Sequence, residues 1–182
     1  TREFKVYNEK DGLQSNEFNA NAYYQGINGE MFFGGVNGFN RFFPREIQDD
    51  QHVPSVAFTD FLLLNQSVPI KKRKDSDKPK QFMLNKAINE LDELTLSYRE
   101  NFVTFEFSAF HYTAPMNNQY AYKLEGENEN WIYTDASNRR ATYTNIEAGS
   151  YVLRVKASNG DGYWNELGKS LKIQVLPLSL IH

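Results

Sequence analysis

The stretch that decides the fold runs from Tyr120 to Trp164. It contains, in order, Tyr120-Ala-Tyr122, Trp131, Arg140-Ala-Thr-Tyr143, Gly149-Ser-Tyr151 and Asn159-Gly-Asp-Gly-Tyr-Trp164. Aromatic residues recur here at alternating positions, with turn residues between the groups. Alternation sends successive side chains to opposite faces of a strand, so this stretch predicts β-hairpins stacked into a sandwich.

Strands of the same kind are predicted on both sides of this stretch. Residues 103–109 alternate strictly between apolar and polar side chains. The other predicted strands cover residues 56–64, 94–96, 120–125, 151–158 and 171–175. Residues 87–93 could form one turn of helix at most. Short strands separated by turns predict an all-β fold, an antiparallel β-sandwich of immunoglobulin or fibronectin III-like shape over residues 55–176.

Four tyrosines are predicted to face the core of this sandwich, because they alternate as inward residues do: Tyr120, Tyr122, Tyr143 and Tyr151. Tyr151 follows a glycine turn and opens a strongly alternating strand. A tyrosine at such a corner often bonds through its hydroxyl to nearby backbone, and we expect this of Tyr151.

Residues 1–47 have a different pattern. The predicted strands are Phe4–Tyr7, Ala22–Tyr24, Glu30–Phe33 and Phe39–Phe43, and Asn28-Gly29 is the signal of a tight hairpin. Such a group of short strands is typical of one blade of a β-propeller. One blade cannot bury both its faces, so we expect it to lean on the next domain, pair with another chain or stay partly disordered. Residues 48–54 are polar and are predicted to be a linker.

The composition argues against several classes of partner and site. Net charge is only -3, which argues against nucleic acid as a partner. The chain has no Cys, which excludes disulfides, thiolate zinc sites and a Cys nucleophile, and it has no apolar run long enough to span a membrane. The 182 residues begin at Thr1 and end at His182, and both ends are interpreted as cuts through a longer protein.

The aromatic positions quoted above resemble those of the triple-tyrosine (Y_Y_Y) domain. That domain follows a two-propeller sensor in hybrid two-component histidine kinases of gut bacteria. Residues 11–44 contain Asp11-Gly-Leu-Gln-Ser-Asn-Glu-Phe18 and Phe33-Gly-Gly-Val-Asn-Gly-Phe39, and they resemble the last regulator-propeller repeat before it. Together the two resemblances cover nearly the whole chain.

The resemblance implies a periplasmic sensor that works as a homodimer, here expected to associate through the sandwich. A transmembrane helix would lead from the sensor to a kinase, a receiver and a DNA-binding output, and residues 177–182 would be the truncated lead-in to that helix. Polysaccharide breakdown products are the usual signals of the family. The chain lacks the other propeller repeats, so the oligosaccharide is expected mainly at those missing propellers.

Some aromatic residues lie beside predicted loops and are candidates for ligand contact: Trp131, Tyr133, Tyr163 and Trp164. Their flat rings could form a platform for the apolar face of a sugar. The alternative is that they fill the core and the ends of the sandwich.

Other polar groups have two interpretations each. Lys71–Lys74 could contact an anionic glycan or a membrane surface, or form a solvated loop. Arg139 and Arg140 could bridge a dimer, or discourage edge pairing of strands. Residues 126–130 and 159–162 offer oxygen ligands for calcium, but without the spacing of a dedicated site they are predicted to be turns.

Catalysis has little support in the sequence. A carboxylate pair for glycoside hydrolysis is defined in space rather than in sequence, and no particular Asp or Glu stands out for that role. His52, His111 and His182 are scattered along the chain, and no nucleophile, metallohydrolase or phosphate-loop motif is present. We therefore expect a non-enzymatic chain without cofactor or metal: a coupling module of a sensor kinase. The rivals are a carbohydrate-binding module that uses Trp131 and Trp164, and an accessory domain of a secreted glycosidase.

Overall fold

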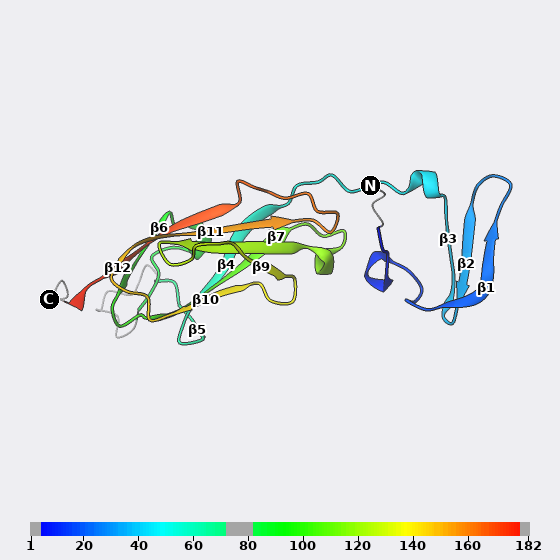
Figure 1. The fold of residues 1–182 in the computed structure, drawn as a ribbon. Helices are drawn as coiled ribbons and strands as arrows, with labels where there is room; N and C mark the ends of the chain where they lie inside the picture. Colours follow the sequence, from blue (N-terminus) through cyan, green and yellow to red (C-terminus); the bar gives the residue numbers. More distant parts are fainter. Residues whose placement is uncertain (1–4, 72–81, 179–182) are drawn as a thin grey trace. The chain divides into compact units, whose positions relative to one another are not determined.

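The computed structural model describes residues 5–71 and 82–178 and separates the chain into two compact units, Thr1–Gln51 and His52–His182. The fold is all-β, as predicted (Figure 1). Helical structure in the described ranges is limited to short 3-10 turns: η1 (Glu9–Asp11), η2 (Pro44–Glu46), η3 (Ile88–Glu90) and η4 (Pro115–Asn117). No helix in these ranges is long and apolar enough to cross a membrane.

The N-terminal unit is a three-stranded antiparallel meander of β1 (Phe18–Gln25), β2 (Met31–Gly35) and β3 (Gly38–Phe42). The hairpin predicted at Asn28-Gly29 joins β1 to β2, and Gly29 has the positive φ of 85° that such a turn needs. The strand predicted at Phe4–Tyr7 is wrong for Lys5–Tyr7, because Asn8 caps η1 and turns the chain there; Phe4 lies outside the described residues.

No residue described in this first unit is buried. Large apolar side chains are left in solvent on its sheet, among them Tyr23 (70% exposed), Tyr24 (64%) and Phe39 (65%). A three-stranded sheet has too few neighbours to cover both of its faces, which agrees with the expectation from the sequence.

The C-terminal unit is a sandwich of two sheets. One has the order β10-β7-β4-β5, with strands β4 (Ser55–Leu63), β5 (Gln66–Ser67), β7 (Phe102–Phe110) and β10 (Arg140–Thr144). The other has the order β6-β12-β11-β8-β9, with strands β6 (Glu93–Ser97), β8 (Gln119–Glu125), β9 (Ile132–Asp135), β11 (Gly149–Ser158) and β12 (Lys169–Leu176). The predicted sandwich is thus confirmed, with one departure: β12 pairs with β6 in parallel.

The core lies between the two sheets and follows the alternation of the sequence. On β7 the apolar set Val103, Phe105, Phe107 and Ala109 is buried, as predicted. The rings of Phe61 and Phe105 lie 5.0 Å apart between centroids. Packed aromatic rings bury a large apolar area between the two sheets.

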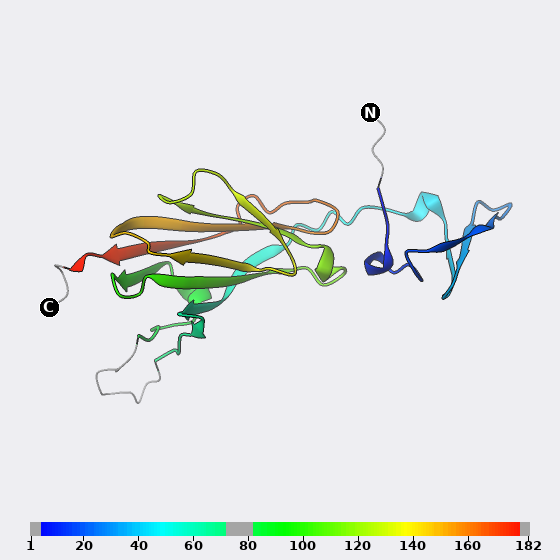
Figure 2. The same ribbon diagram turned by 60° about the horizontal axis from the view of Figure 1, so that its bottom comes forward.

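The chain enters and leaves the sandwich at opposite ends. β4 begins beside the last residues of β7, and the segment before it is tied to the turn that follows β11. β12 ends beside Gly149, the first residue of β11. We call these the incoming end and the outgoing end, and Figure 2 shows them at opposite ends of the sandwich. The ten residues of β11 run between them, a span of about 30 Å at the usual rise of a strand.

Candidate functional site

An aromatic cluster lies on the outer face of the five-stranded sheet. Its members are Trp131, Tyr133, Trp164 and Lys156. Strand register explains the gathering: Tyr133 lies opposite Ala121, which in turn lies opposite Lys156, so the three form one row across β9, β8 and β11. Ala121 has no side chain beyond Cβ, and larger neighbours bury it completely.

Lys156 is the centre of this aromatic cluster. Its Nζ lies 4.9 Å from the ring centroid of Trp131 and 5.1 Å from that of Trp164, and it donates to Oε2 of Glu166 at 2.8 Å. The Tyr133 ring meets Trp164 edge to face, with centroids 5.8 Å apart. Lys156 is only 8% exposed, so the ring faces and one carboxylate offset the loss of water around its charge.

The structure therefore brings together three of the four aromatic residues predicted to contact a ligand. Tyr163 is held separately, by a hydrogen bond from its backbone N–H to Oδ1 of Asn159. Sequence reasoning missed Lys156 and Glu166; the signal for Lys156 was its outward position on β11. Because Lys156 covers one face of each indole, a stacked ligand would have to use the opposite faces and Tyr133, which is 65% exposed.

The four predicted core tyrosines differ in depth. Tyr120 is buried, and its hydroxyl accepts from the backbone N–H of Ala109 at 3.2 Å. Tyr122 and Tyr151 are half-buried against the core. Tyr151 donates to the backbone oxygen of Glu147 at 3.1 Å, which confirms the expected corner contact.

Tyr143 is buried on the edge strand β10. Its hydroxyl donates to Oδ1 of Asn128 at 2.9 Å, and its ring meets Tyr122 edge to face. Burial raises the pKa of Tyr143 far above its ordinary value, and the neighbouring Tyr122 raises it further. Burial also raises the pKa of Tyr122. Both hydroxyls thus favour the neutral form, as suits structural groups.

Two side-chain amides fasten the incoming end. Asn159 donates to the backbone oxygen of His52 at 2.9 Å, and Asn165 donates to that of Pro54 at 2.9 Å. Pro54 is itself buried. The polar residues 52–54, predicted to be part of a linker, are therefore bonded to the loop that follows β11.

Two of the histidines also meet at the incoming end. The rings of His52 and His111 stack with centroids 5.8 Å apart, and Nδ1 of His111 donates to Oδ1 of Asn118 at 3.1 Å. His52 and His111 lie far apart in the sequence and meet because the fold brings residue 52 beside the end of β7; His182 lies outside the described residues. Among the residues described, no three His, Asp or Glu side chains are placed to hold a metal ion.

The arginines predicted at a strand edge do lie at the edge of the four-stranded sheet. Arg140 pairs with Glu106 across β10 and β7 at 2.8 Å, and Arg139 donates to Oγ of Ser108 at 3.0 Å. The loops at 126–130 and 159–162 are turns. Of the basic run Lys71–Lys74, all but Lys71 lies outside the described residues.

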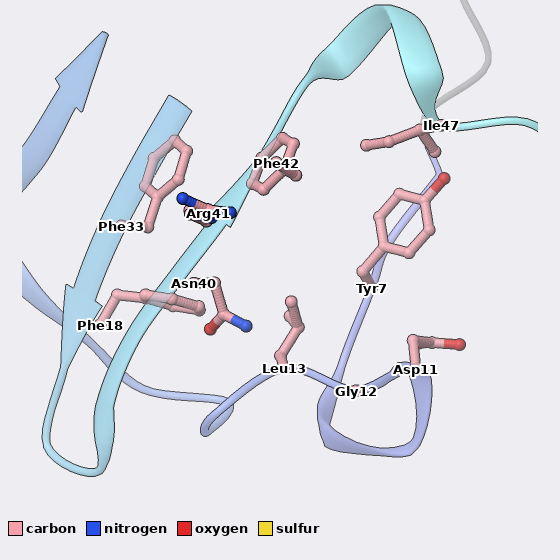
Figure 3. Close-up of a pocket in the computed structure, with 10 residues that line it drawn as sticks. All are labelled: Tyr7, Asp11, Gly12, Leu13, Phe18, Phe33, Asn40, Arg41, Phe42 and Ile47. Atoms are coloured by element: carbon pink, nitrogen blue, oxygen red, sulfur yellow. The ribbon is translucent and has the colours of Figure 1, made fainter. Parts of the chain in front are cut away.

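The N-terminal unit has a hollow of its own, about 550 Å³ in volume. Figure 3 shows its largely apolar wall, to which Tyr7, Leu13, Phe42 and Ile47 contribute. Phe33 and Phe42 are stacked with centroids 5.8 Å apart. The hollow lies against a sheet in which no described residue is buried.

With this geometry in place, part of the chain can be matched to a known family model. Residues 111–176 match the family model of the Y_Y_Y domain. This region includes β8 to β12 and all four tyrosines predicted for the core.

The relatives come from bacterial two-component systems. Histidine kinase P4 of Formosa agariphila is 36% identical over 177 residues, which are 97% of this chain and 12% of that protein. The extracellular domain of a hybrid two-component system from B. thetaiotaomicron matches 94% of this chain and 22% of its own, with a TM-score of 0.71 and 25% identity. A second such domain from the same organism matches 84% of this chain and 19% of its own, with a TM-score of 0.59 and 26% identity. The chain thus spans about an eighth of the length of the curated relative.

Proposed function

We propose that this chain is an extracytoplasmic coupling segment of a two-component histidine kinase, located in the periplasm and without catalytic activity of its own. Its sandwich would carry a change in the sensor to the membrane as a change in subunit geometry rather than by chemistry. The relatives support this role, because they are a histidine kinase and extracellular domains of hybrid two-component systems.

The observation that carries the proposal is the path of the chain through the sandwich. Residues 52–54 are bonded to the loop after β11 at the incoming end, and β12 leaves at the outgoing end. Between the two ends lies a packed core with three aromatic rings at its centre, Phe61, Phe105 and Phe107. A movement imposed on the incoming segment would therefore be transmitted through a stiff body, since packed cores deform little.

The test is to loosen this path in the full-length protein. A short Gly-Ser spacer after Gln51 should abolish the change in kinase autophosphorylation that an activating oligosaccharide causes, found first by screening a panel with the unmodified protein. The same spacer in the exposed turn at Leu64-Asn65 should leave that response intact, because this turn joins β4 to β5 away from the path. An unchanged response with the spacer after Gln51 would refute the coupling role.

Residues 1–47 are proposed to be the last repeat of a β-propeller. The exposed rings on their sheet support this, because neighbouring repeats would cover them. In the complete extracellular region, the amides of β1 to β3 should exchange with deuterium more slowly than in this chain alone. Equal exchange in both would argue against a propeller repeat.

The chain is also proposed to associate as a homodimer through the sandwich, with the oligosaccharide bound mainly by other parts of the protein. Light scattering on residues 1–182 and on a version beginning at His52 tests the dimer: two dimers support it, and two monomers oppose it. The rival carbohydrate-binding role has one observation in its favour, the exposed Tyr133 beside Trp164. Saturable quenching of tryptophan fluorescence by neutral oligosaccharides, lost in Trp131→Ala, would favour that rival.

A further inference from the structure

A polar hollow of about 570 Å³ lies on the outer face of the four-stranded sheet, away from the aromatic cluster. Its floor is formed by residues 106–108 of β7, and one wall is formed by residues 137–140. The other wall is Thr59, where the register of β4 against β7 shifts at a β-bulge. Bulges redirect side chains and recur next to functional sites.

The wall at 137–140 is held in place by its own hydrogen bonds. Oδ1 of Asp135 accepts from the backbone N–H of Ser137 at 2.8 Å and from its hydroxyl. Thr134 donates through Oγ1 to the backbone oxygen of Asn138 at 2.8 Å. The backbone N–H of Phe107 donates to the backbone oxygen of Arg139 at 3.1 Å. The hollow is thus preformed, which lowers the entropy cost of binding.

The two arginines that line the polar hollow have different hydrogen-bond and ion-pair partners. Arg140 is paired with the carboxylate of Glu106. Arg139 donates one bond to Ser108, and within the described ranges no carboxylate forms an ion pair with it. A guanidinium has five N–H donors in a planar fork, so Arg139 has donors left for a ligand. The residues that line the hollow carry one net positive charge, from Arg139, Arg140 and Glu106. Asp60 and Asp135 lie next to lining residues but do not line the hollow themselves.

We propose that the polar hollow binds the oxyanion of a small hydroxylated ligand, an acidic saccharide that carries a carboxylate or a sulfate. Arg139 would hold the oxyanion, since its fork matches both groups. The hydroxyls of Thr59 and Ser137 and the amide of Asn138 would bond the sugar hydroxyls. Phe107 is the aromatic residue of the lining, and it is only 1% exposed, so its ring cannot stack on a sugar. Charge and hydrogen bonds must therefore provide the recognition, which favours an acidic sugar over a neutral one.

Calorimetric titration of residues 1–182 tests this proposal. The probes are digalacturonate for the carboxylate, galactose 6-sulfate for the sulfate, galactobiose as the neutral sugar and inorganic sulfate as the bare ion, all at one ionic strength. Arg139→Gln removes the guanidinium that is proposed to hold the oxyanion. Arg99→Gln is the matched control, because it removes the same charge from an exposed arginine that contacts Tyr98 at the outgoing end.

At least one acidic sugar should bind, and Arg139→Gln should weaken it at least about tenfold, the loss expected for one charge-assisted hydrogen bond. Arg99→Gln should change the affinity less than about twofold. Whichever acidic sugar binds identifies the group. The proposal is overturned if no acidic sugar binds at about 10 mM or if Arg139→Gln has no effect on the affinity. It is also overturned if galactobiose binds as tightly as the acidic sugars. If inorganic sulfate binds as tightly as they do, the hollow holds an adventitious ion only. Because this chain alone is titrated, the result does not depend on the coupling role and can fail while that role holds.

Discussion

The side-chain amide of Asn159 donates a hydrogen bond to the backbone oxygen of His52, 2.9 Å away and 107 positions earlier in the chain. Its Oδ1 accepts from the backbone N–H groups of Asp161 and Tyr163. One fully buried side chain thus shapes its own turn and holds the segment that leads into the sandwich. Asparagine suits this position because it has both a donor and an acceptor at one end.

Replacing that donor should loosen the incoming end. Asn159→Asp keeps an oxygen for the two N–H groups but loses the donor to His52, and Asn165→Asp does the same for the bond to Pro54. Each should lower the free energy of unfolding by about 1–3 kcal/mol, because a part-buried hydrogen bond to a backbone carbonyl is lost. Urea unfolding measures the effect. Asn130→Asp, in an exposed turn, is the control, and a loss no larger than its own would contradict the prediction.

Lys156 should matter more to stability than its exposed partner does. Lys156→Met keeps the apolar stem but removes the ammonium from both indoles, at a cost of about 1–2 kcal/mol. Glu166→Gln removes only a carboxylate that is 71% exposed and should cost less than about 1 kcal/mol. The chain has two tryptophans, both in this aromatic cluster, so Lys156→Met should also shift the emission spectrum. Equal costs in the two variants would mean that the rings contribute nothing.

Ser158 is a candidate for stabilisation by substitution. It is fully buried, and its Oγ has no hydrogen-bond partner among the described residues. Ser158→Ala removes the unsatisfied hydroxyl and should raise the midpoint of thermal unfolding, with a gain of up to about 1–2 kcal/mol. Ser150→Ala breaks an exposed bond to Gln174 and should give no gain. A loss of stability in Ser158→Ala would show that its hydroxyl has a partner in solution.

Tyr143 should make the fold sensitive to alkali. Burial raises its pKa in the folded state, so the folded state holds the proton more tightly than the unfolded chain does. Its contribution is therefore complete below about pH 10, the ordinary tyrosine pKa, and is lost as the pH rises from there toward the folded pKa, at up to about 1.4 kcal/mol per pH unit.

Tyr143→Phe tests this contribution. The variant should cost about 1 kcal/mol at neutral pH, because the bond to Asn128 is lost, and it should lose stability less steeply above pH 10. Urea unfolding as a function of pH, with Tyr112→Phe as the control at an exposed site, measures both effects. If the free energy of unfolding falls equally steeply above pH 10 in Tyr143→Phe and in the unmodified chain, Tyr143 is not the source of the alkali sensitivity.

The alternation of side chains was sufficient to predict the main strands and the corner contact of Tyr151, because alternation reflects burial directly. It failed where the outer face of a strand is also covered. Ala121, Lys156 and Ser158 occupy outward positions on β8 and β11, yet all three are buried by aromatic side chains or by the loop beyond β11. The side chains that cover these positions are brought there by the register of the strands, which the sequence does not reveal.

The candidate site was likewise predictable from the sequence only in part. Trp131 and Trp164 are conspicuous as residues and were identified, whereas their partner Lys156 could be found only from the pairing of β9, β8 and β11. The stacking of His52 on His111 and the bonds from Asn159 and Asn165 join positions far apart in the chain, for which a single sequence has no signal. The parallel pairing of β6 with β12 is non-local for the same reason.

The separation of the incoming and outgoing ends has a mechanical consequence. Tension between them would act along β12, which is hydrogen-bonded to β11 on one side and to β6 on the other. Force along a strand loads all its ladder bonds together in shear, whereas force across a hairpin opens them one at a time. The sandwich should thus yield abruptly and only at high load, and it should behave as a rigid body under modest forces.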